Sequence, residues 1–425
     1  MESPADRGEE PAGSPARPLR VLFFSPSWPP AAASNGIVSY IGNLRPALQR
    51  AGVRSVVVAG HCAGDVSDPE VVDLARTPRS NVVADLVDRA LCRVQPARSG
   101  VRHATRHMAD VIRSVEQAQG VDLVEIEESF GAAEQLVRRL RTPVVVRLHG
   151  PWFLTGAALG VPQDGSFAWR VRQEGRGIAR AAAVTSPSRA TLDQVRAQYR
   201  LPLATAEVVP NGGPEVSDEE CWTLGRCDPD LLLFVGRFDR LKGGDLALAA
   251  FREIAAARPS VRLAFVGPDR GLIGGDGTAI GLPAFLERAV PEAAIRARIE
   301  VTGPLPAPAV AALRRRAYLT IVPSRYESFS MTVLEALAHG CPVVAADAGG
   351  IPELVRDGDN GRLFRAGDAR HLASILRSLL SDRAAAERMA RAARTDYLAR
   401  FAPEVVARQM ASFYRRVVAR HRVAG

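Results

Sequence analysis

The sequence predicts an α/β protein made of two doubly wound domains, in which helices cover both faces of a parallel sheet. Three observations support this fold class. Short apolar runs alternate with amphipathic helical stretches in both halves of the chain. Loops with glycine or polar residues follow these runs, as they do at the carboxyl ends of parallel strands. The length of 425 residues is large for one hydrophobic core and suits two domains of roughly 200 residues each.

The first half of the chain begins with a strand–helix–strand unit, the building block of a doubly wound sheet. Its first loop, residues 28–36, contains proline, alanine and glycine but no Gly-x-Gly-x-x-Gly pattern, so we expect no dinucleotide site there. A break at Ala51-Gly52 separates the helix from the second strand. The predicted elements of this half are a helix over 36–51 and strands over 20–27, 53–60, 123–126, 144–148 and 181–188.

The second half repeats the alternation of strands and helices. Gly236 turns the chain after its first strand, and Gly244 or Asp245 begins the helix that follows. Gly340 ends a later helix. A final amphipathic helix follows Phe401. The predicted elements are strands over 231–235, 319–322 and 342–346, a helix over 330–339, and strands with their glycine turns within 261–271 and 299–306.

Two glutamates lie around the start of the helix over 330–339. Glu327 is in the loop that follows a buried strand, where open parallel sheets bind ligands, and Glu335 is one turn inside the helix. The free backbone amides of Phe329, Ser330 and Met331 at the helix N-terminus favour a phosphate group. The carboxylate of Glu335 can accept hydrogen bonds from two adjacent hydroxyls, such as those of a ribose. This pattern indicates a nucleotide-sugar site.

Lys242 is the only lysine of the chain, because every other basic residue in the Lys+Arg total of 55 is an arginine. It lies five residues after Arg237, in a glycine-containing loop at the carboxyl end of the strand over 231–235. A diphosphate is bound well by a planar guanidinium together with a compact ammonium. We therefore predict that Arg237 and Lys242 bind a diphosphate together.

These motifs resemble those of the retaining, nucleotide-sugar-dependent glycosyltransferases of family 4, also called glycosyl transferases group 1. The mark of this family is a glutamate, seven residues and a second glutamate, followed by a small-residue strand and a Gly-Gly-Ile-Pro-Glu turn. In this chain the two glutamates are Glu327 and Glu335, the strand is 342–346 and the turn is 349–353. The family usually has glycine where this chain has Ser330, which adds a side chain beside the donor.

The resemblance implies the GT-B fold, in which two Rossmann-like domains face each other across a cleft and a C-terminal helix crosses back to the first domain. It covers residues 20–422 and is strongest over 231–365. The expected division is a disordered tail (1–18), an acceptor-side domain (19–213), a linker (214–230), a donor-binding domain (231–398), and a crossing helix with a tail (399–425).

The resemblance also implies roles for single residues. Arg237 and Lys242 would stabilise the charge on the leaving nucleoside diphosphate, Glu327 would bind hydroxyls of the donor sugar, and His149 would point into the cleft. The family's glycine pair after the first strand reads Asn35-Gly36 here, so only its second glycine is carried over. The expected catalytic residues are His149, Arg237, Lys242 and Glu327, and the expected donor-binding residues are Gly36, Gly236, Gly267, Phe329, Ser330, Met331 and Glu335.

The expected activity is transfer of a hexosyl group, of glucose or N-acetylglucosamine type, from a nucleoside diphosphate sugar with retention of configuration. The resemblance favours a UDP-linked donor and a hydroxyl acceptor on a small molecule, a glycan or a lipid head group. We expect neither a metal nor a cofactor beyond the sugar nucleotide, since Arg237 and Lys242 supply positive charge. Alternatives are a GT-B epimerase, a phosphorylase and a noncatalytic protein that binds sugar nucleotides.

The net charge of +9 comes mostly from arginines spread along helices, which predicts solvated faces. Two denser clusters, 314–316 and 415–422, are candidates for contact with an anionic acceptor or, peripherally, with a membrane. Nucleic-acid binding is disfavoured, because aromatic residues make up only 6% of the chain and no basic run is interleaved with them.

Five scattered cysteines, no signal-peptide pattern and no apolar stretch of membrane length predict a cytoplasmic location. The segment Asp228-Pro229-Asp230 has the spacing of a metal-binding Asp-x-Asp. Because a rigid proline separates the two acids, we interpret it as a turn within the linker.

Overall fold

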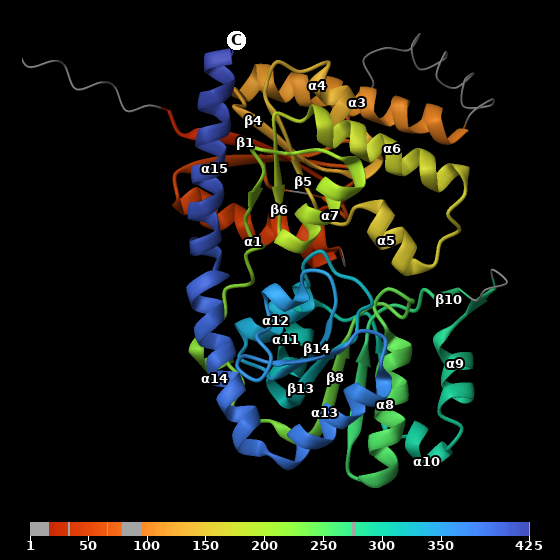
Figure 1. The fold of residues 1–425 in the computed structure, drawn as a ribbon. Coiled ribbons are helices and arrows are strands. Elements are labelled where there is room, and N and C mark those ends of the chain that lie inside the picture. The colour runs from red at the N-terminus through yellow and green to blue at the C-terminus, as the bar shows by residue number, and fades with distance from the viewer. Residues whose placement is uncertain (1–16, 33–34, 66, 79–95, 274–277, 425) are drawn as a thin grey trace, which may run out of the picture.

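The structure is a computed structural model and describes residues 17–32, 35–65, 67–78, 96–273 and 278–424. Each half of the chain contains one large parallel sheet with helices on both faces, and a long helix forms the C-terminal end (Figure 1). The predicted fold class of two Rossmann-like domains is thereby confirmed. The predicted disordered tail lies outside the described residues as far as residue 16, and so does Cys92.

The first sheet has the strand order β3-β2-β1-β4-β5-β6-β7, and all its strands are parallel. The strands predicted for this half lie within two residues of the observed bounds. The strands are β1 Leu19–Ser25, β2 Val53–Ala59, β3 Val71–Asp73, β4 Leu123–Glu127, β5 Val144–Arg147, β6 Ala183–Ser186 and β7 Glu207–Val208. The helices are α1 Gly36–Arg50, α3 Pro96–Gln119, α4 Ala132–Val137, α5 Trp152–Leu159, α6 Gly165–Arg180 and α7 Arg189–Tyr199.

The second sheet has the strand order β12-β9-β8-β13-β14-β15, again all parallel, and a short antiparallel pair β10-β11 lies beside it. The helix after β8 begins at Gly244, one of the two starts predicted. The strands are β8 Asp228–Val235, β9 Arg262–Val266, β10 Leu272–Ile273, β11 Ala279–Ile280, β12 Ile299–Gly303, β13 Ala317–Val322, β14 Val343–Asp347 and β15 Arg362–Arg365. The helices are α8 Gly244–Ala257, α9 Leu282–Ala289, α10 Ala293–Arg296, α11 Ala307–Arg316, α12 Met331–Ala338, α13 Ala369–Ser381, α14 Arg383–Arg400 and α15 Pro403–Ala424.

The last helix belongs to the core of the first domain. Alternate residues of β1 face opposite sides of the sheet, so Val21 and Phe23 enter one core and Leu22 the other. Met410 and Tyr414 of α15 are fully buried in the same core as Val21, together with apolar residues of α1. Figure 1 shows α14 beside the second domain and α15 running along the first. The predicted crossing helix is therefore α15.

In each sheet the strand order reverses beside the first strand, between β1 and β4 and between β8 and β13. Such a reversal opens a crevice beyond the carboxyl ends of the two strands, where open α/β sheets bind ligands. The loops over 236–243 and 323–330 follow β8 and β13 and meet at the crevice of the second sheet. They contain the predicted diphosphate and sugar ligands.

The predicted turn at Asp228-Pro229-Asp230 is wrong, because strand β8 begins at Asp228 and takes the last residues of the predicted linker. Asp228 is paired with Arg262 of β9, and Asp230 lies 2.8 Å from the guanidinium of Arg258. These ion pairs occupy both carboxylates. A proline is tolerated near the start of a strand, where its missing N–H removes little of the ladder.

Two arginines of the cluster over 415–422 pair with the first domain, so that cluster is not a free basic face at these positions. Arg416 lies 2.6 Å from Glu207, and Arg422 lies 3.3 Å from Asp122. Among the residues that the structure describes, no helix combines the length and apolarity needed to cross a membrane.

Candidate functional site

Lys242 and Glu327 meet at the crevice of the second sheet, although they come from different loops. The Lys242 Nζ lies 2.6 Å from the Glu327 Oε1. The Ser324 hydroxyl donates a hydrogen bond of 2.9 Å to the same carboxylate oxygen. Only 26% of the Lys242 side chain and 11% of the Glu327 side chain are exposed. Because an ammonium has three donors, Lys242 can bond to Glu327 and to a phosphate oxygen at the same time.

Asp239 organises the loop that carries both predicted cations. Its buried carboxylate accepts a hydrogen bond of 2.7 Å from the Arg237 Nε and one of 2.8 Å from the Lys242 backbone amide. Arg237 and Lys242 are thus held on one short loop after β8. Asp239 was not among the residues predicted from the sequence. An acid placed between two cations in a glycine-containing loop is the signal that could have identified it.

Two residues at the N-terminus of α12 are buried, and their side chains point into the protein. Ser330 is fully buried and caps the helix, since its hydroxyl accepts a hydrogen bond of 3.4 Å from the Val333 amide. The additional side chain at this position is therefore directed to its own helix. The Phe329 ring packs edge-on against Phe401, with centroids 6.0 Å apart. The side chains of Phe329 and Ser330 are therefore both engaged within the protein.

Glu335 is paired with Arg314, which corrects the interpretation of residues 314–316 as an exposed basic cluster. The Arg314 guanidinium is bonded to the Glu335 Oε2. Only 1% of the Arg314 side chain is exposed, whereas 33% of the Glu335 side chain is. Arg314 lies on α11, which covers the sheet, so its side chain enters the core. This pairing holds one Glu335 oxygen and leaves part of the carboxylate accessible.

Two glycines predicted to approach a donor also hold the strand ends of the second sheet together. Gly267 has a φ of 140°, and a Cβ there would overlap the Gly236 carbonyl oxygen. The Gly236 amide in turn donates a hydrogen bond of 2.9 Å to the Val266 carbonyl. The backbones after β8 and β9 therefore approach each other more closely than residues with side chains would allow.

His149 of the first domain lies at the carboxyl end of β5, as predicted. Its ring packs edge-on against Tyr40, with centroids 5.2 Å apart. The backbone amides of His149 and Gly150 donate hydrogen bonds of 2.9 and 2.6 Å to the two oxygens of Glu128. The Trp152 amide donates one of 2.8 Å to Glu174. These two buried glutamates, which the sequence analysis missed, fix the loop that carries His149.

Burial and the nearby Arg147 guanidinium hold the pKa of His149 well below its ordinary value. The imidazole is therefore neutral at pH 7, so it can both donate and accept a hydrogen bond. The Glu128 carboxylate shows the opposite effect, since burial raises its pKa.

The depressed pKa of His149 predicts a pH dependence of stability. Below a pH of about 6.5 the unfolded histidine binds a proton that the folded one does not, so stability falls as the pH falls. We expect wild type to lose stability relative to His149→Gln between pH 7.5 and 5.5. The slope stays below the limit of about 1.4 kcal/mol per pH unit, because a single histidine takes up at most one proton. Parallel urea titrations of both proteins measure it, and equal slopes would contradict the assignment.

The two domains meet at the N-termini of α1 and α12. Asn35 caps α1, since its side-chain oxygen accepts a hydrogen bond of 2.8 Å from the Ile37 amide. A Cβ on Gly36 would lie 3.9 Å from the Cγ of Met331 at the start of α12. The structure thus brings together Gly36 and Met331, which the sequence placed in one site from opposite halves of the chain.

A cavity of about 460 Å³ lies between the domains beside the start of α1. Asn35 and Leu159 line it from the first domain, and Arg237, Arg240 and Arg270 line it from the second. The concentration of guanidinium groups on one wall suits an anionic ligand. The wall also contains Arg237, one of the two predicted diphosphate ligands.

Comparisons with known proteins agree with this arrangement. The family model described as "Glycosyltransferase Family 4" matches residues 34–213, and the model described as "Glycosyl transferases group 1" matches residues 223–396. The D-inositol 3-phosphate glycosyltransferase of Mycolicibacterium paratuberculosis is 39% identical over 192 residues, which are 45% of this chain and 41% of that protein. The chain thus matches only about two fifths of the length of that relative. The glycogen synthase of Mycobacterium tuberculosis is 27% identical over 93% of this chain and 94% of its own length.

Solved structures share the fold over nearly the whole chain. Sucrose-phosphate synthase from Thermosynechococcus elongatus has a TM-score of 0.71 and 20% identity, covering 95% of this chain and 100% of that one. Anabaena HepE in complex with UDP and glucose has a TM-score of 0.63 and 20% identity, covering 93% and 98%. The two family models match the two halves of the chain in sequence order, and each half contains one of the two sheets. The chain therefore belongs to family 4 of the glycosyltransferases, with the GT-B fold.

Proposed function

We propose that this protein transfers a hexosyl group from a UDP-linked sugar to a hydroxyl acceptor with retention of configuration. One observation supports the proposal most directly. Lys242, Glu327 and Arg237 lie on the two loops that meet at the crevice of the second sheet. These are the groups that a sugar diphosphate needs, and Arg237 faces a cavity shared with the first domain.

Each group has a role that its chemistry suits. Arg237 and Lys242 bind the diphosphate, and the amides at the start of α12 add the positive end of a helix dipole. These fixed donors stabilise the charge that develops on the leaving group. Glu327 accepts hydrogen bonds from hydroxyls of the transferred sugar. Glu335, held by Arg314, accepts those of the ribose.

The transfer step exchanges one bond of the anomeric carbon for another. The bond from that carbon to the diphosphate oxygen breaks, and the acceptor oxygen forms a new bond on the same face. The proton of the acceptor hydroxyl passes to an oxygen of the leaving diphosphate, which therefore serves as the base. Lys242 and Arg237 balance the negative charge until that proton arrives. Neutral His149 would orient a sugar hydroxyl from the first domain.

The proposed donor is inferred from a structural neighbour, and the acceptor is proposed only as a chemical class. Anabaena HepE has been solved in complex with UDP and glucose and with UDP-glucose, which favours uracil as the base and glucose as the sugar. N-acetylglucosamine is the second candidate sugar. The relatives named above act on different acceptors, so we propose only that a hydroxyl of a small molecule, a glycan or a lipid head group is the acceptor.

A donor screen followed by product analysis tests this function. Thermal shift of the protein with nucleotide sugars identifies the donor, and mass spectrometry of cell extract incubated with that donor identifies a product heavier by one hexosyl residue. Turnover of the donor without any acceptor would favour an epimerase, and turnover dependent on inorganic phosphate would favour a phosphorylase. Binding of the donor with no turnover in any extract would favour a noncatalytic protein and contradict the proposal.

A metal chelator is expected to leave activity nearly unchanged. The reason is that Arg237, Lys242 and the α12 amides already supply positive charge to the diphosphate. In the described ranges of the chain no three His, Cys, Asp or Glu side chains are grouped for metal binding. Initial rates with millimolar EDTA measure the effect. Activity that is lost in EDTA and restored by manganese or magnesium would contradict this expectation.

A further inference from the structure

Glu353 of the second domain bonds to the first helix turn of α7 in the first domain. It lies at the end of the turn over 349–353, beyond strand β14. Its Oε1 accepts a hydrogen bond of 2.8 Å from the Ala190 amide, and its Oε2 accepts one of 2.9 Å from the Arg189 amide. A single carboxylate therefore bridges the two domains with both of its oxygens.

The Glu353 carboxylate accepts hydrogen bonds from the start of α7, although it belongs to the other domain. Ser188 caps the helix and accepts a hydrogen bond of 3.2 Å from the Thr191 amide. The first turn of α7 contains no acidic residue of its own. The two amides before Thr191 are the ones that Glu353 bonds, and a carboxylate at this end also interacts favourably with the helix dipole. Glu353 thus completes the cap of a helix in the other domain.

The surfaces around this contact are closely fitted. Thr191 is fully buried, and its hydroxyl lies 3.2 Å from the Tyr326 hydroxyl. A Cβ on Gly350 would lie 2.8 Å from the Ser188 side chain. The helix start and the turn therefore meet without intervening space, as two surfaces do in a closed arrangement of the domains.

The same turn is bonded to the loop that contains Glu327. The Gly350 amide donates a hydrogen bond of 2.7 Å to the Glu327 carbonyl, and a Cβ on Gly349 would overlap that carbonyl. Tyr326, which contacts α7, is the residue directly before Glu327. The position of the Glu327 backbone is thereby tied to the turn that Glu353 ends.

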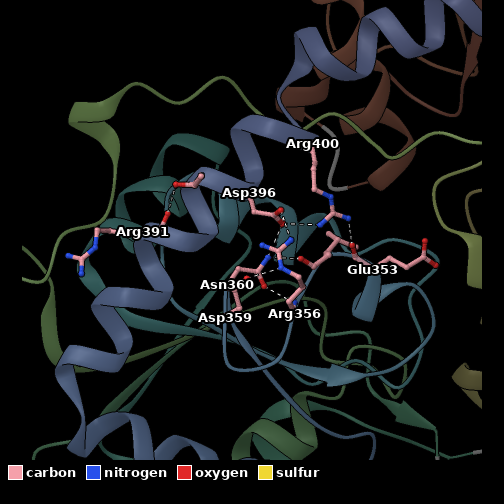
Figure 2. Close-up of polar contacts among 9 residues, drawn as sticks. Glu353, Arg356, Asp359, Asn360, Arg391, Asp396 and Arg400 are labelled. Carbon is pink, nitrogen blue, oxygen red and sulfur yellow. Dashed lines mark hydrogen bonds and ion pairs between the residues drawn. The ribbon is translucent and has the colours of Figure 1, made fainter.

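On its other side the turn is held by a polar cluster near the end of α14, in which Asp396 and Asn360 are buried. The Arg400 guanidinium donates a hydrogen bond of 2.6 Å to the Glu353 carbonyl and one of 2.9 Å to Asp396. Asp396 also accepts bonds of 2.7 Å from Arg356 and 2.9 Å from Asn360 (Figure 2). Helix α14 ends at Arg400, and α15, which packs on the first domain, begins at Pro403. This cluster keeps the turn from moving independently of α14.

We infer that Glu353 is a positioning residue that ties the closing of the two domains to the placement of Glu327. When its carboxylate reaches the start of α7, the turn is fixed from the first domain, and the Glu327 loop is fixed through it. The structural part of this inference stands on the contacts alone. Its effect on catalysis rests on the proposed function of the site.

The structural part is tested by replacing Glu353 with glutamine, which keeps the size but turns an amide NH₂ toward one of the helix amides. Glu387→Gln is the matched control, because Glu387 is a half-exposed residue of α14 that is paired across one helix turn, 3.3 Å from Arg391. Hydrogen exchange read by mass spectrometry should accelerate by about ten- to a hundredfold in peptides over 188–192 of the Glu353 variant alone. Small-angle scattering with UDP bound should show a larger radius of gyration for that variant.

The catalytic part is tested by kinetics of the same proteins. Glu353→Gln should lower the turnover number by about tenfold or more and change the donor Michaelis constant by less than about threefold, because Glu353 contacts no predicted donor group. Unchanged exchange over 188–192 would overturn the inference, whatever the activity. Faster exchange with unchanged kinetics would overturn its catalytic part. If wild type has no transferase activity, the exchange and scattering results still decide the structural part separately from the proposed function.

Discussion

Replacing Lys242 by alanine is expected to lower the turnover number by about a hundred- to a thousandfold while the donor Michaelis constant rises by less than about tenfold. Charge on the diphosphate oxygens grows as the glycosidic bond stretches, so the ammonium contributes most in the transition state. The change also removes the cation that lies 2.6 Å from Glu327, a carboxylate with only 11% exposure. Steady-state rates over a range of donor concentrations separate the two constants.

Two further variants make this test specific to Lys242. Lys242→Arg should recover only part of the activity, because a planar guanidinium does not reproduce a compact ammonium on a flexible stem. Arg391→Ala removes an exposed cation of α14 that does not line the cavity, and it is the matched control. It should change the rate by less than about threefold, as expected for an exposed charge. Full activity in Lys242→Arg would show that the only lysine of the chain has no special role.

The main elements of the fold could be predicted because strands buried on both faces are continuous apolar runs. Strand β13 lies beneath helices on both sides, and all its residues are buried. Strands β10 and β11 were not predicted, since a strand of two residues is too short to show an alternation of apolar and polar residues. The start of β8 was missed for another reason. Its Asp-Pro-Asp composition is typical of a turn, and the backbone pairing that makes it a strand comes from the distant residue Ala317 of β13.

The candidate site was predicted as a set of residues but not as a set of contacts. A motif could place Lys242 and Glu327 in one site, yet their ion pair depends on how loops of two strands approach each other. Three consecutive arginines suggested a solvated cluster. On a helix, however, successive residues point in different directions, so one of the three on α11 faces the sheet. That residue is Arg314. Its guanidinium is buried and is paired with the Glu335 carboxylate.

The pair of Arg314 and Glu335 predicts linked losses of stability and nucleotide binding. Glu335→Ala should weaken UDP binding by about ten- to a hundredfold, the scale of hydrogen bonds to a charged group. It should also destabilise the second domain by about 3 kcal/mol, because it leaves a guanidinium that is 99% buried without its carboxylate. Calorimetric titration with UDP measures the first effect, and urea unfolding measures the second.

A second substitution separates these two effects. Arg314→Met in the Glu335→Ala background removes the unpaired charge while keeping an apolar stem, so it should recover most of the lost stability and none of the lost UDP affinity. In the wild-type background, Arg314→Met should weaken UDP binding as well, since Glu335 then loses the partner that orients it. An unchanged UDP affinity in Glu335→Ala would show that Glu335 does not bind the ribose. A double variant as unstable as Glu335→Ala would show instead that the buried pair is not what stabilises this part of the domain, because relieving the unpaired charge would then have gained nothing.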